Sequence, residues 1–167
     1  METAFGSLNR HQRGRLDIID DDPRRYAFSN LFEVASKSEP YRKIAVAKNF
    51  EYVLEALRAE GLSPWWAAPH DEFALVMDGE VVIELLDPSR QVCDPGGAGA
   101  VELPDAPQGK PMGRVTARRG HMTLLPAMRC YRFRAIRPGV ILLQTIGGTH
   151  TEYRWSEICD GMEGRNG

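Results

Sequence analysis

The chain has 167 residues, of which 43% are apolar and 26% are charged, and its formal net charge is −2. This length and composition are typical of one globular domain that buries a core of its own. Because the charge is near zero and no long basic run occurs, binding to nucleic acid or to an anionic membrane surface is not expected.

Three organisational units are predicted along the chain. Residues 1–25 are polar and are predicted to form an extended arm, without the apolar run of a secretory signal. Residues 26–160 are predicted to form a single domain, and residues 161–167 a loose tail. The three cysteines are odd in number and widely spaced. They favour free thiols in the cytoplasm over a disulfide framework or a zinc site.

The first half of the domain is predicted to contain two strands and one helix. Tyr26 to Val34 and Lys43 to Lys48 alternate between apolar and polar residues, as strands do. Asn49 to Gly61 is predicted to be a helix, because the asparagine can cap its first turn and the glycine can close its last one.

The second half of the domain is predicted to be strands and turns. Phe73 to Leu86 indicates a hairpin around the pair Asp78-Gly79. The segment from Asp87 to Pro111 is rich in glycine and proline and is predicted to be a long loop. Four further short strands are predicted, over Met112 to Arg118, His121 to Leu125, Arg129 to Ala135 and Gly139 to Thr145. Short strands at this spacing favour a sandwich or a barrel.

Two stretches of the chain have the spacing of known sequence motifs. Glu72 is followed after six residues by Gly79, and Gly120 is followed after five residues by Pro126. The first spacing resembles the second half of the first cupin motif and the second resembles the start of the second cupin motif, so the chain resembles the cupin superfamily. The resemblance implies a mainly β fold: a cupin-type double-stranded β-helix (jelly-roll) barrel, here with the amino-terminal arm and one or two short helices.

The metal-ligand positions of the cupin motifs hold other residues in this chain. Depending on the gap, the His-x-His pair falls on Trp65 and Ala67 or on Trp66 and Ala68, and the last histidine falls on Tyr131. The carboxylate Glu72 remains. A metal cupin needs two or three imidazoles and a carboxylate around its ion. The resemblance therefore implies no catalytic, cofactor-binding or metal-binding residue on this chain.

Two alternatives for the polar and aromatic residues stay open. A shifted metal site could use His70, Glu72 and His121, or the two histidines could simply make hydrogen bonds at the barrel rim. Trp65, Trp66 and Tyr131 could fill the core, or they could contact a partner subunit or line its ligand pocket, since large aromatic side chains contribute to cores and interfaces alike. On the strand after Arg129, Tyr131, Phe133 and Ala135 should point inward, leaving Arg132 and Arg134 outside.

A closer resemblance covers most of the chain. The stretches LDIIDDDPRRYAFSNLFEVASKSEPY, KNFEYVLEALRAEG, AAPHDEFALVMDGEV, MGRVTARRGHMTLLPAMRCYRFRA and ILLQTIGG resemble the small (alpha) subunit of two-component hydroquinone 1,2-dioxygenases. The resemblance implies an oxidoreductase that opens the ring of hydroquinone with O₂ to give 4-hydroxymuconic semialdehyde, in bacterial breakdown of para-nitrophenol and related aromatics.

The resemblance also implies a division of labour between subunits. Fe(II) is expected on a larger, cupin-like partner in a heterotetramer, and none on this chain, which alone should be inactive. Two competing hypotheses remain at this point: a self-sufficient cupin dioxygenase or isomerase that uses His70, Glu72 and His121, and a stand-alone ligand-binding or regulatory cupin. The missing His-x-His pair speaks against the first, and the arm favours a subunit over the second.

Overall fold

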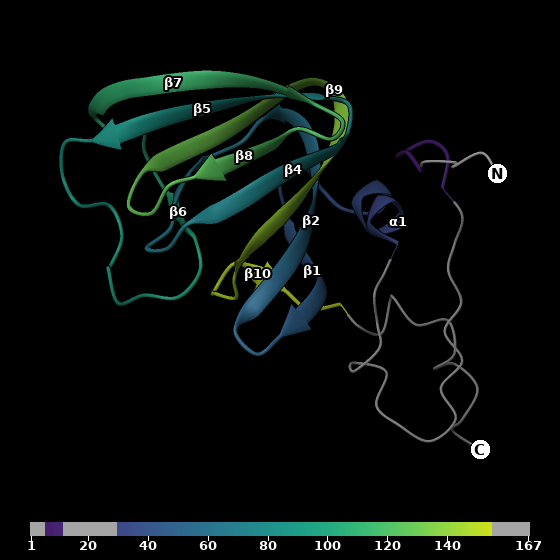
Figure 1. The fold of residues 1–167 in the computed structure, drawn as a ribbon, viewed down its shortest axis with the longest axis horizontal. Helices are drawn as coiled ribbons and strands as arrows, with labels where there is room; N and C mark the ends of the chain where they lie inside the picture. The colour runs from purple at the N-terminus through teal and green to yellow at the C-terminus, as the bar shows by residue number, and fades with distance from the viewer. Residues whose placement is uncertain (1–5, 12–29, 155–167) are drawn as a thin grey trace.

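Alternating apolar side chains place one face of most strands on the inside of a single curled sheet (Figure 1). The structure, a computed structural model, describes residues 6–11 and 30–154. In these residues the elements are α1 (Leu31–Ser36), β1 (Lys43–Asn49), β2 (Tyr52–Leu62), β3 (Trp65–Ala67), β4 (Glu72–Asp78), β5 (Glu80–Pro88), β6 (Val101–Leu103), β7 (Gly109–Arg118), β8 (Met122–Leu125), β9 (Cys130–Ile146) and β10 (Thr151–Glu152).

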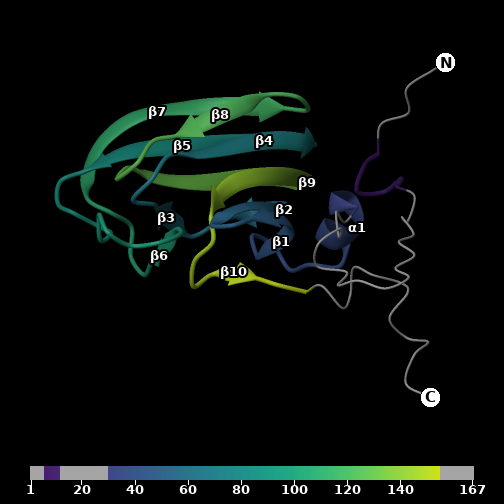
Figure 2. The same ribbon diagram turned by 60° about the horizontal axis from the view of Figure 1, so that its bottom comes forward.

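The long strand β9 organises the sheet. Its 17 residues pair antiparallel with β2 and β3 on one side and with β4 and β5 on the other. Beyond these partners, β1 and β10 extend the sheet past β2, β6 pairs with β3, β7 with β5, and β8 with β4. Figure 2 shows the resulting layers, with β10, β1 and β2 below β9 and with β4, β5, β7 and β8 above it. The mainly β, cupin-type barrel that the sequence predicts is confirmed.

The inner face of the curled sheet forms the core. Glu72, Ala74 and Val76, which alternate along β4, are fully buried, and this is the period of a strand with one buried face. The same alternation on the other strands supplies large buried apolar side chains, namely Leu57, Ile83, Leu125, Tyr131, Phe133, Ile141 and Leu143. Burial of these side chains is the main favourable contribution to folding.

The predicted helix over Asn49 to Gly61 is wrong, because this segment is strand β2. It pairs with β9 at ten positions, from Tyr52 opposite Ile146 to Leu62 opposite Arg134. Leucine, glutamate and alanine favour helices in isolation, but this preference is a weak one that tertiary pairing overrides. Residues 53, 55, 57 and 59 are buried on one face of the strand, and the small side chain of Ala56 is buried as well.

The predicted strand over Tyr26 to Val34 is also wrong where it can be compared. Its last residues lie in the helix α1, whereas residues 26–29 lie outside the described residues. The Asn30 side chain caps this helix by accepting from the backbone N–H groups of Phe32 and Glu33, at 3.1 and 3.4 Å. An asparagine at the N-cap satisfies amide donors that a short helix otherwise leaves unpaired.

The predicted hairpin at Asp78-Gly79 is a bend. Both strands exist, but β4 pairs with β8 and β9, and β5 pairs with β7 and β9, so the chain continues along β9 after the bend. Gly79 has a φ of +78°, a left-handed backbone conformation that glycine adopts more readily than other residues. A Cβ atom there would lie 2.9 Å from the Cα of Gly139 on β9. Close approach of two strands therefore fixes this glycine.

The prediction of two strands on either side of Arg137-Pro138-Gly139 is wrong, since β9 runs through this segment. The register with β2 shifts opposite it, between Ala59 and Gly61, and such an irregularity accommodates a proline in a sheet. The predicted strands that became β1, β7 and β8 are confirmed. The predicted loop over Asp87 to Pro111 is shorter than expected, because β6 and the start of β7 lie within it.

Most of the predicted arm over residues 1–25 lies outside the described residues. Its described part, residues 6–11, contains a tight turn between Ser7 and Arg10. The backbone N–H of Leu8 donates a hydrogen bond of 3.0 Å to Asp78 Oδ2 at the end of β4. This part of the arm therefore contacts the barrel. The tail over residues 161–167 lies outside the described residues.

Candidate functional site

Polar side chains from five strands point into the barrel. They are Lys43 on β1, Glu55 on β2, Trp66 on β3, Glu72 on β4 and Tyr131 on β9, and each is at most 4% exposed. Strand alternation carries them inside: Glu55 and Ala45, for example, face each other across β1 and β2 on the inner side of the sheet. We call these five residues the interior polar cluster.

The interior polar cluster is connected by short contacts. Tyr131 Oη donates a hydrogen bond of 2.5 Å to Glu72 Oε2. The ammonium nitrogen of Lys43 lies 3.3 Å from Tyr131 Oη and 3.8 Å from Glu55 Oε2, and it stands 4.6 Å from the centroid of the Trp66 ring. Ammonium groups are attracted both by carboxylates and by the negative face of an aromatic ring.

Burial changes the acidity of the cluster. It raises the pKa of Tyr131 well above the ordinary value, and the negative charge of Glu72 adds to the effect. Burial also raises the pKa of Glu55, against the opposing influence of Lys43. At neutral pH Tyr131 is therefore a hydrogen-bond donor and not a phenolate.

Several buried polar atoms of this region have no hydrogen-bond partner within the described residues. They are Glu55 Oε2, Glu72 Oε1, Trp66 Nε1 and His70 Nδ1. Buried polar groups are ordinarily paired, and leaving one unpaired costs about 1–3 kcal/mol. The interior therefore retains polar capacity that its own side chains do not use.

His70 lies at the edge of the cluster, between β3 and β4. Its Nε2 atom accepts from the backbone N–H of Ile146 at 3.2 Å and lies 3.1 Å from Thr145 Oγ1. Because Nε2 acts as an acceptor, the neutral ring carries its proton on Nδ1. Burial lowers the pKa of His70, which favours this neutral form.

The alternative ligand set His70, Glu72 and His121 does not come together. His121 is exposed in the turn between β7 and β8, where its Nδ1 atom accepts from the backbone N–H of Arg118 at 2.9 Å. Within residues 6–11 and 30–154, no group of three histidine, cysteine, aspartate or glutamate side chains could hold a metal ion. His70 and Glu72 share a region of the barrel, as their spacing predicts, but His121 lies elsewhere.

The aromatic residues predicted from the motif occupy different surroundings. Trp66 and Tyr131 are paired directly across β3 and β9 inside the barrel. Trp65 points the other way and is half-buried, with the guanidinium of Arg132 stacked 4.6 Å from its ring centroid. The predicted inward alternation of Tyr131, Phe133 and Ala135 is confirmed. Contact of Trp65, Trp66 or Tyr131 with a partner subunit stays a prediction.

Sequence reasoning missed Lys43 and Glu55. Glu55 was hidden by the mistaken helix over its segment, which gave it no inward direction. Lys43 starts a strand that the sequence predicts correctly. Because residues two apart share a strand face, its alternation with the inward-facing Ala45 was the one indication that Lys43 points inward. A lysine is almost never fully buried unless it is paired, which is why an outward position is the usual expectation.

The residues present do not fit the metal of a cupin enzyme. Tryptophan and alanine offer no ligand atom at the His-x-His positions, and a phenol replaces the last imidazole. The ammonium of Lys43 lies 3.3 Å from that phenol, where a second cation would be repelled. A six-coordinate iron site built from imidazoles and a carboxylate does not form from this set.

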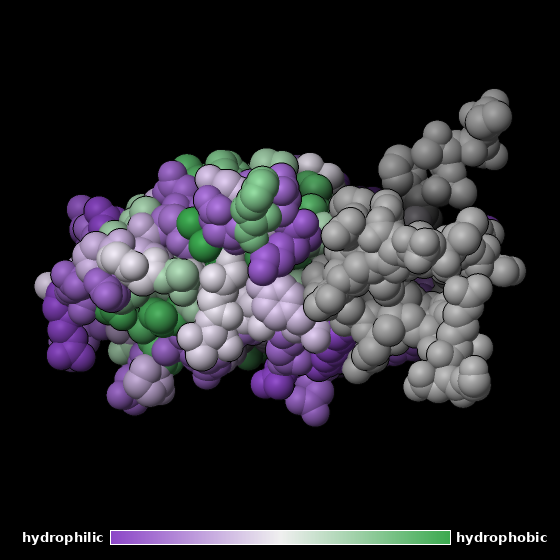
Figure 3. Space-filling model, turned by 90° about the horizontal axis from the view of Figure 1, so that it is seen from below, coloured by the Kyte–Doolittle hydropathy of each residue, from purple (hydrophilic) through white to green (hydrophobic). Residues whose placement is uncertain are grey.

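The outer face of the same strands carries exposed apolar residues. Phe73 on β4 is 38% exposed, and Met122 and Leu124 on β8 are 62% and 44% exposed. They adjoin Leu75 and Leu142, because β4 is paired with both β8 and β9. We call these five residues the outer apolar patch. On the face seen in Figure 3, hydrophobic and hydrophilic side chains are intermixed.

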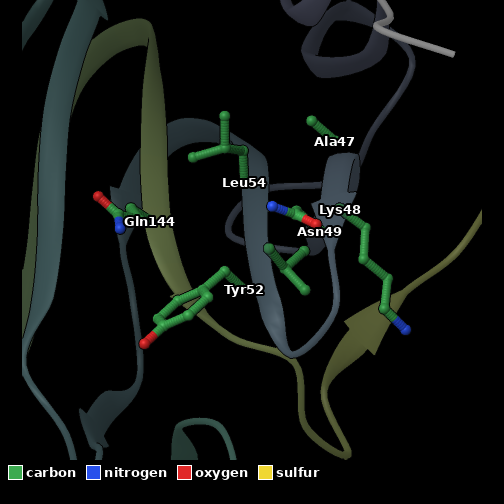
Figure 4. Close-up of a pocket in the computed structure, with 7 residues that line it drawn as sticks. Ala47, Lys48, Asn49, Tyr52, Leu54 and Gln144 are labelled. Atoms are coloured by element: carbon green, nitrogen blue, oxygen red, sulfur yellow. The ribbon is translucent and has the colours of Figure 1, made fainter. Parts of the chain in front are cut away.

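A pocket of about 400 Å³ lies beside the outer apolar patch. Figure 4 shows Tyr52 and Leu54 from β2, Gln144 from β9 and Ala47 to Asn49 from β1 around it. Gln144 is paired with both Leu54 and Phe73, so the pocket and the patch belong to one continuous surface.

The barrel and its interior define the chain as a cupin-type protein whose ligand positions hold other side chains. Two solved structures match it almost from end to end. A hydroquinone 1,2-dioxygenase PnpCD in complex with Cd²⁺ and 4-hydroxybenzonitrile shares 52% identity over 95% of this chain and 96% of that chain, with a TM-score of 0.87. The hydroquinone 1,2-dioxygenase from Sphingomonas sp. TTNP3 with 4-hydroxybenzoate bound shares 48% identity over 96% and 98%, with a TM-score of 0.89. The chain belongs to the hydroquinone 1,2-dioxygenase family, as its small subunit.

A second, longer chain appears in structures of the same enzymes. The Sphingomonas enzyme in complex with 4-nitrophenol contains a chain of which this protein covers 39%, at 18% identity and a TM-score of 0.59. That likeness shows a shared fold alone. None of the protein-family models and none of the curated proteins searched matches the chain. Among the described residues, no helix has the length and apolar character needed to span a membrane.

Proposed function

We propose that this chain is the non-metal-binding cupin subunit of an iron(II)-dependent dioxygenase that converts hydroquinone and O₂ to 4-hydroxymuconic semialdehyde. Both oxygen atoms of O₂ enter the product as one ring bond is broken, so no further reductant is needed. The iron is held by the larger partner subunit, in a cytoplasmic heterotetramer that acts in breakdown of para-nitrophenol and related aromatics.

The observation that carries the proposal is the occupation of the cupin ligand positions. Trp66 and Tyr131 hold two of them, Tyr131 engages the remaining carboxylate Glu72, and Lys43 brings a positive charge into the same space. These side chains occupy the space in which a metal ion would offer coordination positions to O₂ and a phenol. Their presence supports a reaction centre on another chain of the enzyme.

The outer apolar patch and its adjoining pocket support assembly with that partner. Exposed apolar side chains that adjoin one another on a sheet face are typical of interaction sites. The occupant that we propose is the longer chain of the same enzyme, because structures of two enzymes of this family contain a longer chain alongside the small subunit. Burial of Phe73, Met122 and Leu124 against that chain would stabilise the complex.

The experiment that tests the proposal separates the subunits and recombines them. Each chain is purified alone, loaded anaerobically with iron(II), and assayed for oxygen uptake with hydroquinone. We expect neither chain alone to consume oxygen with hydroquinone, and we expect the mixture to do so. Turnover by this chain alone would contradict the proposal and would favour a self-sufficient enzyme.

A further inference from the structure

An ammonium group lies where the cupin ligand positions converge. Lys43 starts strand β1, which lies outside both motifs, yet its Nζ atom is 3.3 Å from Tyr131 Oη and 4.6 Å from the Trp66 ring centroid. Tyr131 in turn holds Glu72 at 2.5 Å. Lys43 is 3% exposed, so its charge is in a low-dielectric interior and not at the surface.

Two carboxylates surround this single cation. Glu55 is 1% exposed and lies 3.8 Å from Lys43 Nζ, and Glu72 is fully buried one hydrogen bond away through Tyr131. Each of them keeps one oxygen, Glu55 Oε2 or Glu72 Oε1, without a hydrogen-bond partner among the described residues. A positive charge nearby stabilises the ionised form of a buried carboxylate, since an isolated buried ion is strongly unfavourable.

We propose that the ammonium of Lys43 is a built-in cation that takes the place of a metal ion in this barrel. The interior polar cluster is then a cation site of single positive charge, formed by Glu55, Glu72, Tyr131 and the ring of Trp66. The cation that this site accepts is a primary alkylammonium ion, and in the native chain the side chain of Lys43 supplies it. The alternative is that Lys43 only fills space with its aliphatic stem.

The proposal concerns the interior of this chain and does not depend on where the enzyme holds its iron. Its test uses the stability of the full-length chain, without iron and without turnover. A partner subunit that proved to hold no iron would therefore leave this proposal standing, and failure of this test would leave the proposed function standing.

The first experiment is chemical rescue. Lys43→Ala removes three methylene carbons and the ammonium, which together correspond to propylammonium. We expect the variant to unfold several degrees below the wild type. Propylammonium chloride should raise its Tm in a saturable way, whereas equal concentrations of tetramethylammonium chloride or NaCl should not. At ten times its Kd, a ligand raises the ratio of folded to unfolded chains about tenfold. Wild type and Lys110→Ala, which removes an exposed lysine on β7, should not respond to propylammonium.

The second experiment keeps the test decisive if Lys43→Ala does not fold. Lys43→Met retains most of the side-chain volume but removes the charge, and it is compared in the wild-type chain and in a Glu55→Gln/Glu72→Gln background. We expect the substitution to lower the ratio of folded to unfolded chains at least about tenfold in the wild type, or to prevent folding there, and to be nearly neutral in the glutamine background. The same loss in both backgrounds, or a folded Lys43→Ala chain that gains nothing specific from propylammonium, would overturn the built-in cation.

Discussion

The Oη atom of Tyr131 lies 2.5 Å from Glu72 Oε2, and both side chains are at most 1% exposed. In the cupin motifs these are the positions of the last histidine and of the carboxylate. In metal-binding cupins the side chains at these two positions bind the same metal ion. Here they bind one another through a short, charge-assisted hydrogen bond, which is a strong kind.

This bond predicts the effect of removing a single oxygen atom. Tyr131→Phe leaves Glu72 without its donor in a buried place, and we expect a loss of about 1–3 kcal/mol in the free energy of unfolding. Denaturant titration of the full-length chain measures it. The matched control is Tyr52→Phe, which removes a hydroxyl from a side chain that is 54% exposed and should change stability by less than about 0.5 kcal/mol. Equal effects for both substitutions would contradict the importance of the buried bond.

A second prediction concerns alkaline pH. Burial raises the pKa of Tyr41 to about 12, whereas an unfolded tyrosine ionises near 10. Between these values the folded chain binds more protons than the unfolded chain. The contribution of Tyr41 to the free energy of unfolding is therefore fully present below pH 10 and is lost as the pH rises toward 12. The loss should reach about 2 kcal/mol at pH 12. Tyr41→Phe should weaken this pH dependence, as measured by denaturation at several pH values. An unchanged dependence in the variant would show that Tyr41 does not cause it.

The outer apolar patch predicts where association can be weakened. Leu124→Lys places a charge on a side chain that is 44% exposed, so the isolated chain should keep its Tm. If the larger subunit covers the patch, affinity should fall at least about tenfold, because a buried unpaired charge costs more than about 1.4 kcal/mol. Ile136→Lys is the matched control, since Ile136 is 94% exposed on β9 outside the patch. Titration of one subunit with the other measures the affinity, and equal affinities for both variants would place the interface elsewhere.

The assembled enzyme gives a further prediction. Glu72→Ala removes the one carboxylate that the motif retains, and in a metal site this loss would abolish turnover. In a supporting barrel the substitution should lower stability by about 1–3 kcal/mol and leave most of the turnover at moderate temperature. Oxygen uptake with hydroquinone, both subunits and iron(II) provides the measurement. Loss of turnover in a folded and fully assembled variant would mean that Glu72 takes part in the chemistry.

The spacing of short strands predicted a sandwich or a barrel, and the resemblance of the motifs around Glu72 and Gly120 to those of cupins selected the barrel. The alternation from Phe73 to Met77 and from Tyr131 to Ala135 gave the strands and their inward faces, and the turn glycine Gly79 has the positive φ that its position required. How those strands pair was not predictable in the same way. The bend at Gly79 resembles a hairpin signal, and only the long partner β9 decides against it.

The interior cluster shows the other limit of sequence reasoning. Glu72 and Tyr131 were found through the motif, whereas Lys43 and Glu55 were not, since they lie on β1 and β2, outside it. The sequence of β2 has the residues of a helix, and its pairing with β9 is a long-range event that no local window contains. A buried lysine opposite two carboxylates becomes visible only when the strands are assembled.

The metal content of the separated subunits shows whether this barrel holds iron of its own. Both chains are loaded anaerobically with iron(II), freed of excess metal and analysed for iron per chain. We expect about one iron per larger chain and a negligible amount on this one, unchanged by His70→Ala. About one iron per copy of this chain, lost in His70→Ala, would contradict it.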